Sequence, residues 1–86
     1  MKSRTSRSFW QLYEALPASV QAQSRQAYAL FTANPDHTSL NFKKLNGPGE
    51  RWSVRLGGEY RAVCQRDGAE VTWFWIGTRQ SFGKDF

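Results

Sequence analysis

The sequence has little of the chemistry on which metalloproteins and most secreted proteins depend. Its 86 residues include one cysteine, Cys64, and one histidine, His37. A single cysteine excludes a disulfide framework. One cysteine and one histidine are too few for a Cys/His metal site, and a single histidine excludes any catalytic site that needs a second one. No run approaches the roughly 18 apolar residues that a membrane span requires, and no apolar signal segment follows the first four residues. We therefore expect one reduced, cytoplasmic domain over residues 1–86, with no metal, no cofactor and no membrane partner.

Aromatic and basic residues are abundant instead. Aromatic residues make up 15% of the chain, and 12 Lys and Arg against 7 Asp and Glu give a net charge of +5. So many large rings argue for a folded core rather than disorder. Most of the cations are arginines, whose planar guanidinium binds a phosphate through two parallel hydrogen bonds. This composition favours a nucleic-acid partner, with an ordinary charged surface as the alternative.

The first part of the chain predicts two helices that form an antiparallel hairpin. Residues 8–16 carry apolar side chains at helical spacing, namely Phe9, Leu12, Tyr13 and Leu16. Pro17 suits the first position of a second helix that runs to about Thr32, where Asn34-Pro35 ends it. Residues 2–6 are compatible with a short edge strand before the hairpin.

From residue 52 onward the hydrophobic period changes to two, which predicts three strands. They cover residues 52–56, 60–65 and 70–76 and are separated by Gly57-Gly58-Glu59 and Asp67-Gly68. The predicted fold is α+β, with the N-terminal helical hairpin packed on one face of a three- to four-stranded antiparallel sheet.

The turn lengths predict which side chains share a face of this sheet. A three-residue turn places Val54 opposite Ala62, and a two-residue turn at Asp67-Gly68 places Trp75 opposite Tyr60. The predicted core face consists of Trp52, Val54, Leu56, Tyr60, Ala62, Cys64, Val71, Trp73 and Trp75. Cys64 is then a buried and inert thiol, whereas His37 is a solvated loop residue.

The opposite face of the sheet carries two arginines directly across from each other, Arg55 and Arg61. Opposed like charges cost a few tenths to about 1 kcal/mol, so the pair indicates an anion between them. On the same face Phe74 and Ile76 form uncovered apolar surface on which a base can stack. Alternatively, a C-terminal tail or a partner chain covers this surface, and Glu59 or Glu70 neutralises the arginines.

The chain resembles the RelE/ParE superfamily of bacterial type II toxin–antitoxin toxins from about Arg4 to the end, and four segments carry the resemblance. The segments are Phe42-Lys43-Lys44-Leu45, Trp52-Ser53-Val54-Arg55, Tyr60-Arg61-Ala62-Val63 and Trp73-Phe74-Trp75-Ile76-Gly77. The resemblance implies a sheet that binds messenger RNA in the ribosomal A site and a cognate antitoxin that neutralises the toxin. It also implies cleavage without a metal, by attack of the 2′-hydroxyl on the adjacent phosphate.

The resemblance assigns roles to particular residues. Arg61 matches the strand arginine at the scissile phosphate, Arg79 matches a position after the last strand, and Lys43 and Lys44 match lysines that hold the RNA backbone. The implied catalytic residues are Arg61, Arg79 and Lys44. The implied RNA-binding residues are Lys43, Lys44, Arg55, Arg61, Phe74, Arg79 and Phe82.

The chain departs from this family at its C-terminal end. Relatives commonly read Ile-Gly-Ser-His-x-x-Tyr, whereas this chain has Arg79 in place of the histidine and Phe82 in place of the tyrosine. A guanidinium stays protonated and is a poor general base, which leaves Lys43 and Lys44 as candidates for proton transfer. Two alternatives follow: a non-cleaving toxin of the gyrase-inhibiting ParE branch, and a family member without catalytic activity.

Overall fold

A computed structural model describes residues 1–86 as a sheet with helices on both faces. In chain order the elements are β1 (Lys2–Thr5), α1 (Arg7–Glu14), α2 (Ala18–Ala33), the 3₁₀ helix η1 (Thr38–Leu40), β2 (Lys43–Lys44), β3 (Arg51–Leu56), β4 (Tyr60–Asp67), β5 (Glu70–Thr78) and α3 (Arg79–Asp85). The five strands form one sheet in the order β1-β5-β4-β3-β2, in which only β1 runs parallel to its neighbour. None of the helices has the length and hydropathy that crossing a membrane requires.

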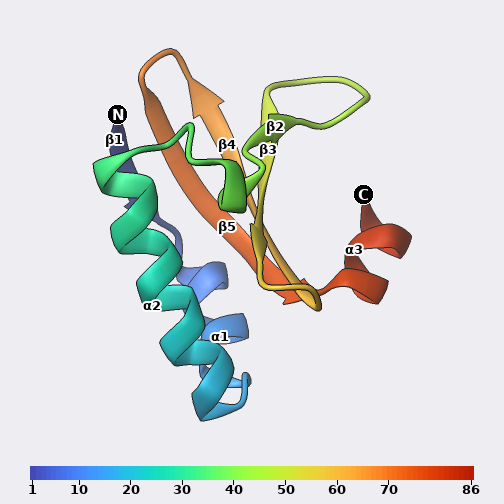
Figure 1. Cartoon of the computed structure of the whole chain (residues 1–86). Helices are drawn as coiled ribbons and strands as arrows, with labels where there is room; N and C mark the ends of the chain where they lie inside the picture. The colour runs from blue at the N-terminus through green and yellow to red at the C-terminus, as the bar shows by residue number, and fades with distance from the viewer.

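The predicted α+β class and the N-terminal helical pair on one face are confirmed. Helices α1 and α2 lie on one side of the sheet, and α3 lies on the other side (Figure 1). The sheet has five strands rather than the three or four antiparallel strands predicted, because the N-terminal edge strand forms as β1, parallel to β5, and the short β2 pairs with β3.

Local sequence signals set the ends of the helices. The Ser6 side chain accepts a hydrogen bond from the Phe9 backbone N–H and so caps α1, and Pro17 directly precedes α2. His37 is exposed and caps η1, where its Nδ1 accepts a hydrogen bond from the Ser39 backbone N–H at 3.2 Å. The exposure of His37 agrees with the prediction that it is a solvated loop residue.

Pairing between β3 and β4 follows the predicted register. Val54 lies opposite Ala62, and Arg55 lies opposite Arg61. The predicted register between β4 and β5 is wrong, because the turn falls one residue later, so that Asp67 pairs with Glu70, and a bulge interrupts the ladder.

The bulge reverses the faces of the side chains that follow it. Cys64 pairs with Trp73 but its neighbour Val63 pairs with Trp75, so Phe74 is the extra residue in β5. Beyond it, Ile76 points into the core and is only 2% exposed, whereas Trp75 lies on the other face. The predictions of a core Trp75 and an uncovered Ile76 are therefore wrong.

The C-terminal helix covers the apolar part of the second face. The Phe86 ring lies 5.2 Å from Trp75 and 6.3 Å from Phe74, and the Phe82 ring lies 6.2 Å from Trp75, measured between centroids. Phe74 is half-buried as a result, so the predicted open stacking surface at Phe74 is wrong and the alternative of a covering C-terminal segment is correct.

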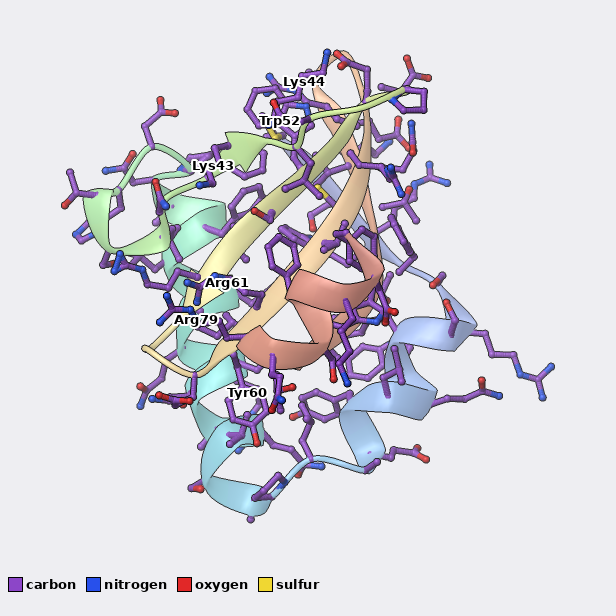
Figure 2. All side chains as sticks on the ribbon, turned by 90° about the vertical axis from the view of Figure 1, so that its right-hand side faces the viewer. Lys43, Lys44, Trp52, Tyr60, Arg61 and Arg79 are labelled. Atoms are coloured by element: carbon purple, nitrogen blue, oxygen red, sulfur yellow. The ribbon has the colours of Figure 1, made fainter.

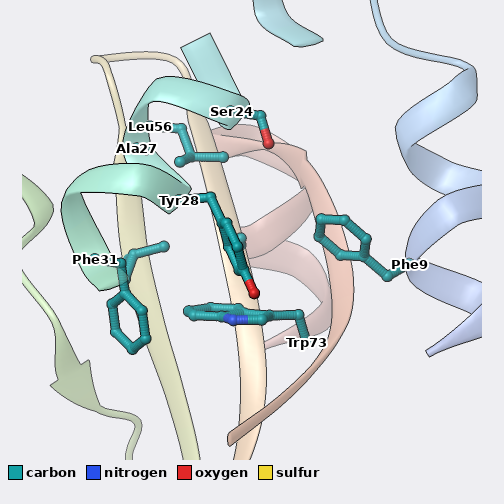
Figure 3. A pocket seen from close by; sticks show the side chains of 9 residues that line it. Phe9, Ser24, Ala27, Tyr28, Phe31, Leu56 and Trp73 are labelled. Carbon is teal, nitrogen blue, oxygen red and sulfur yellow. The ribbon is translucent and has the colours of Figure 1, made fainter. Parts of the chain in front are cut away.

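The main core fills the space between the sheet and the first two helices. Phe9 of α1, Phe31 of α2 and Trp73 of β5 are all buried, and the rings of Phe31 and Trp73 meet edge to face at 5.2 Å. Figure 3 shows these side chains converging with Tyr28 around a cavity of about 30 Å³. This packing holds the sheet as a rigid support for the residues on its other face.

Candidate anion-binding site

A hollow of about 220 Å³ lies on the face of the sheet opposite to α1 and α2. We call it the cationic hollow, and the residues that line it are Asn41, Lys43, Ser53, Arg55, Arg61, Arg79, Phe82 and Gly83. Half of these residues are cationic, and none is acidic.

Four different elements bring the cations to this hollow. Arg55 and Arg61 lie opposite each other on β3 and β4, and Lys43 reaches the same face because it pairs with Ser53. The Arg79 backbone N–H donates to the Glu59 carbonyl at 2.7 Å, which anchors the start of α3 beside the β3–β4 turn. Figure 2 shows Arg61 next to Arg79, with Lys43 farther along the same face.

The cations of the hollow form no ion pair with a carboxylate. The two ion pairs in the structure join Arg4 to Glu70 and Lys44 to Glu50, both at 2.9 Å, and neither involves a cation of the hollow. Glu70 is therefore not the neutralising partner considered from the sequence.

Arg61 experiences the positive charge of the hollow most strongly. It is half-buried, and its Nη1 donates to the Tyr60 carbonyl at 3.0 Å. Burial lowers the pKa of the Arg61 guanidinium, the charges of Arg55 and Arg79 lower it further, and Glu59 acts in the opposite direction. Each of these effects except the last favours the arrival of an anion.

The structure brings most of the predicted site residues together but leaves two outside. The predicted residues that line the hollow are Lys43, Arg55, Arg61, Arg79 and Phe82. Lys44 pairs with Trp52 on the other face of β2, where its amine is bound to Glu50, and Phe74 lies beside the Phe86 ring. Sequence reasoning missed Asn41, Ser53 and Gly83 as lining residues. For Ser53 a signal existed, because it shares the strand parity of Arg55.

The chemistry available in the hollow is charge stabilisation rather than acid–base catalysis at neutral pH. Arginine and lysine side chains donate hydrogen bonds to phosphate oxygens, and Phe82 adds an aromatic surface. No histidine, tyrosine or carboxylate lines the hollow, so Lys43 is its one side chain able to exchange a proton. The structure also has no group of three His, Cys, Asp or Glu side chains arranged to hold a metal ion.

Known toxins share this fold. A chain of the YoeB/ParE toxin from Agrobacterium tumefaciens matches with a TM-score of 0.71 at 20% identity, covering 92% of this chain and 99% of that chain. The RelB–RelE antitoxin–toxin complex from Methanococcus jannaschii matches with a TM-score of 0.77 at 15% identity, covering 96% and 98%. The RelBE2 toxin–antitoxin complex from Mycobacterium tuberculosis matches with a TM-score of 0.72 at 20% identity, covering 91% and 96%.

Sequence comparison identifies the family. Among curated proteins, none matches the chain. The family model of the ParE-like toxin domain matches residues 18–84, which span α2 to α3 and include every residue that lines the cationic hollow. The chain therefore belongs to the family of ParE-like toxin domains, and the resemblance to the RelE/ParE superfamily is confirmed.

Proposed function

We propose that this chain is an endonuclease toxin that cleaves messenger RNA on the ribosome. The observation that carries the proposal is the cationic hollow, where Lys43, Arg55, Arg61 and Arg79 converge with no acidic side chain among them. Opposed arginines reduce stability in the free protein and become favourable only when an anion lies between them. A phosphodiester beside the Phe82 ring fits this arrangement.

In the proposed reaction the hollow binds the phosphate that is cleaved. The ribose 2′-oxygen attacks the adjacent phosphorus, and the bond from phosphorus to the 5′-oxygen breaks. The products are a 2′,3′-cyclic phosphate and a 5′-hydroxyl. Arg61, Arg55 and Arg79 stabilise the negative charge that grows on the phosphate oxygens. Lys43 supplies a proton to the 5′-oxygen as its bond to phosphorus breaks, and water takes the proton that the 2′-hydroxyl loses.

A cognate antitoxin is the proposed protein partner. Several structures that share the fold are complexes of a toxin with its antitoxin. An antitoxin segment that covers the cationic hollow would block access of RNA, which explains how one protein neutralises the other.

A second candidate function is growth inhibition without RNA cleavage. The observation that favours it is the composition of the hollow, where Arg79 and Phe82 stand in place of the histidine and tyrosine usual in relatives. A site of arginines and one lysine binds phosphate strongly but provides little acid–base catalysis. This candidate includes an inhibitor of the gyrase-targeting type and a protein that binds the ribosome without cutting RNA.

The test is to induce the chain in bacteria and map new 5′ ends on messenger RNA across the genome. Arg61→Ala is induced in parallel, and Arg7→Ala is the matched control because Arg7 is exposed and lies on α1, away from the hollow. We expect cuts within translated reading frames for the wild type and for Arg7→Ala, and none for Arg61→Ala.

Two other outcomes would contradict the proposal in different ways. Growth arrest without new 5′ ends would support the second candidate instead. Cuts that persist at the wild-type rate in Arg61→Ala would show that the cationic hollow is not the site of cleavage.

A further inference from the structure

One polar side chain in the cationic hollow remains without a role. Ser53 is 2% exposed and is one of two buried polar residues, the other being Ser24 at 8%. It lies in β3, opposite Lys43 of β2 and Val63 of β4, and lines the hollow. The small part of Ser53 that remains exposed therefore faces the cationic hollow.

The Ser53 hydroxyl has no hydrogen-bond partner in the chain. The other buried serine, Ser24, has no side-chain hydrogen bond either, but it lies among apolar residues beside the core cavity. The Ser53 hydroxyl keeps contact with the hollow, since the Trp52 indole N–H is the one fully buried side-chain polar group without a hydrogen-bond partner. Because cations surround the Ser53 hydroxyl, unlike that of Ser24, a ligand that carries hydrogen-bond acceptors and negative charge can partner it in the hollow.

The surroundings restrict the chemistry of that ligand. Arginine and lysine only donate hydrogen bonds, so a group that fits among them must present acceptors and negative charge. Ser53 belongs to β3, whereas Arg61 and Arg79 belong to β4 and α3, so donors from three elements line the hollow, which suits the several oxygens of a phosphate. The cations attract the anion, whereas the hydroxyl fixes the direction in which one of its oxygens points.

We propose that the Ser53 hydroxyl donates a hydrogen bond to a phosphate oxygen and thereby positions the phosphate that Arg55, Arg61 and Arg79 neutralise. The identification of the ligand as phosphate rests on the function proposed above. Ser53 is a positioning residue in this account, and the binding step is testable without any cleavage.

The test measures binding of inorganic phosphate to the purified full-length chain. Denaturant unfolding is followed at increasing sodium phosphate, with sodium chloride adjusted to keep the ionic strength constant, for the wild type, Ser53→Ala and Ser24→Ala. Ser24→Ala is a matched control because it makes the same change at a buried position that lines the core cavity on the other side of the sheet. Bound phosphate stabilises the folded state, so the rise in stability reports the dissociation constant.

We expect Ser53→Ala to raise the dissociation constant for phosphate roughly tenfold or more, the loss typical of a hydrogen bond to a charged group. Without phosphate the same variant should be about as stable as the wild type, since the hydroxyl that it removes has no partner in the chain. A purely structural role for Ser53 would instead lower stability and leave phosphate affinity unchanged. Ser24→Ala should bind phosphate as the wild type does.

Three results would overturn the assignment. They are wild-type phosphate affinity in Ser53→Ala, equal loss of affinity in Ser24→Ala, and no stabilisation of the wild type by phosphate beyond that of chloride. A failure of the Ser53 assignment can be told apart from a failure of the proposed nuclease function. A wild type that binds phosphate through Ser53 but cuts no RNA would refute the nuclease alone, whereas RNA cleavage with unaltered phosphate binding in Ser53→Ala would refute the assignment of Ser53 alone.

Discussion

At the scale of single residues, the opposed arginines are the feature that folding alone does not explain. Arg55 and Arg61 face each other across β3 and β4, with Arg79 near enough to lower the pKa of Arg61. Like charges in this position destabilise a sheet by a few tenths to about 1 kcal/mol, and an acidic residue at either position would stabilise it by a similar amount. The opposed pair therefore lowers stability at the site that we propose binds phosphate.

Arg55→Glu should have opposite effects on stability and on function. A carboxylate opposite Arg61 replaces repulsion by attraction, so the free energy of unfolding should rise by about 0.5–1 kcal/mol, measured by urea denaturation. Growth arrest on induction should be lost, because the hollow no longer attracts phosphate. Arg55→Gln, which removes the charge without reversing it, should give a smaller gain in stability. Full growth arrest in Arg55→Glu would show that phosphate is bound elsewhere.

Cys64 should be inert in the folded protein and should make stability depend on alkaline pH. The residue is fully buried, and burial raises the pKa of its thiol from 9.0 to about 12. Because the unfolded thiol ionises first, the contribution of Cys64 to stability is complete below pH 9 and is lost as the pH rises toward 12.

Two measurements check this behaviour of Cys64. A thiol reagent should label the native chain no faster than the chain unfolds, and Cys64→Ala should lose less stability than the wild type between pH 9 and pH 11, a window set by the two pKa values. Rapid labelling of the native protein would contradict the burial of the thiol.

At the scale of elements, the bulge in β5 and the helix α3 together shape the second face of the sheet. The bulge turns Trp75 onto this face, where Phe82 and Phe86 of the C-terminal segment pack against it. The same segment carries Arg79 and Phe82 to the edge of the hollow. The position of the site therefore depends on how well α3 is held against Trp75.

Gly77→Ala should loosen α3, because the Trp75 ring lies across Gly77. A Cβ atom at position 77 would approach Trp75 Cζ2 to 2.7 Å, which forces the ring to move. Such overpacking typically costs about 1–3 kcal/mol, so the midpoint of denaturant unfolding should fall and the tryptophan fluorescence should shift to longer wavelength. Gly58→Ala is the control, since nothing lies within 4 Å of a Cβ there. An unchanged midpoint in Gly77→Ala would contradict the placement of Trp75.

The elements also differ in how far the sequence determines them. Pairing of β3 with β4 was predictable, because apolar and polar residues alternate cleanly on both strands and only one register keeps the faces separate. The bulge in β5 was not predictable from the sequence, because its three residues are all aromatic and each suits either face, namely Trp73, Phe74 and Trp75. Strand parity predicted Arg55 and Arg61 on one face, whereas the family resemblance added Lys43 to the same site. Neither indicated that Glu50 binds Lys44, because that contact is set by the path of the loop between β2 and β3.

At the scale of the whole molecule, the fold gathers four of the twelve cationic side chains in one hollow. Lys43, Arg55, Arg61 and Arg79 come from β2, β3, β4 and α3, so only the folded chain holds them together. The helices α1 and α2 pack on the opposite face and leave this surface open (Figure 2). One face of the sheet therefore packs against the main core, and the other carries the hollow that we propose binds phosphate.

Binding of single-stranded RNA should be strongly salt-dependent, and the hollow should account for part of that dependence. Each cation that neutralises a phosphate contributes about 0.7 to the slope of log affinity against log salt concentration. Fluorescence anisotropy with an RNA that carries 2′-O-methyl groups, and is thus not cleaved, measures this slope. Arg61→Ala should reduce it by about 0.7, whereas Arg7→Ala should not. Equal reductions in both variants would mean that RNA binds the surface without using the hollow.

The most direct test of the central claim is cleavage in a reconstituted system. Purified chain is added to a defined messenger RNA, either free or held by a ribosome with an empty A site, and the 5′ ends of the products are mapped by primer extension. The account predicts cleavage within the A-site codon only when the ribosome is present, loss of that cleavage in Arg61→Ala, and retention in Arg7→Ala. Cleavage of free RNA at the same rate, or cleavage that Arg61→Ala leaves unchanged, would contradict it.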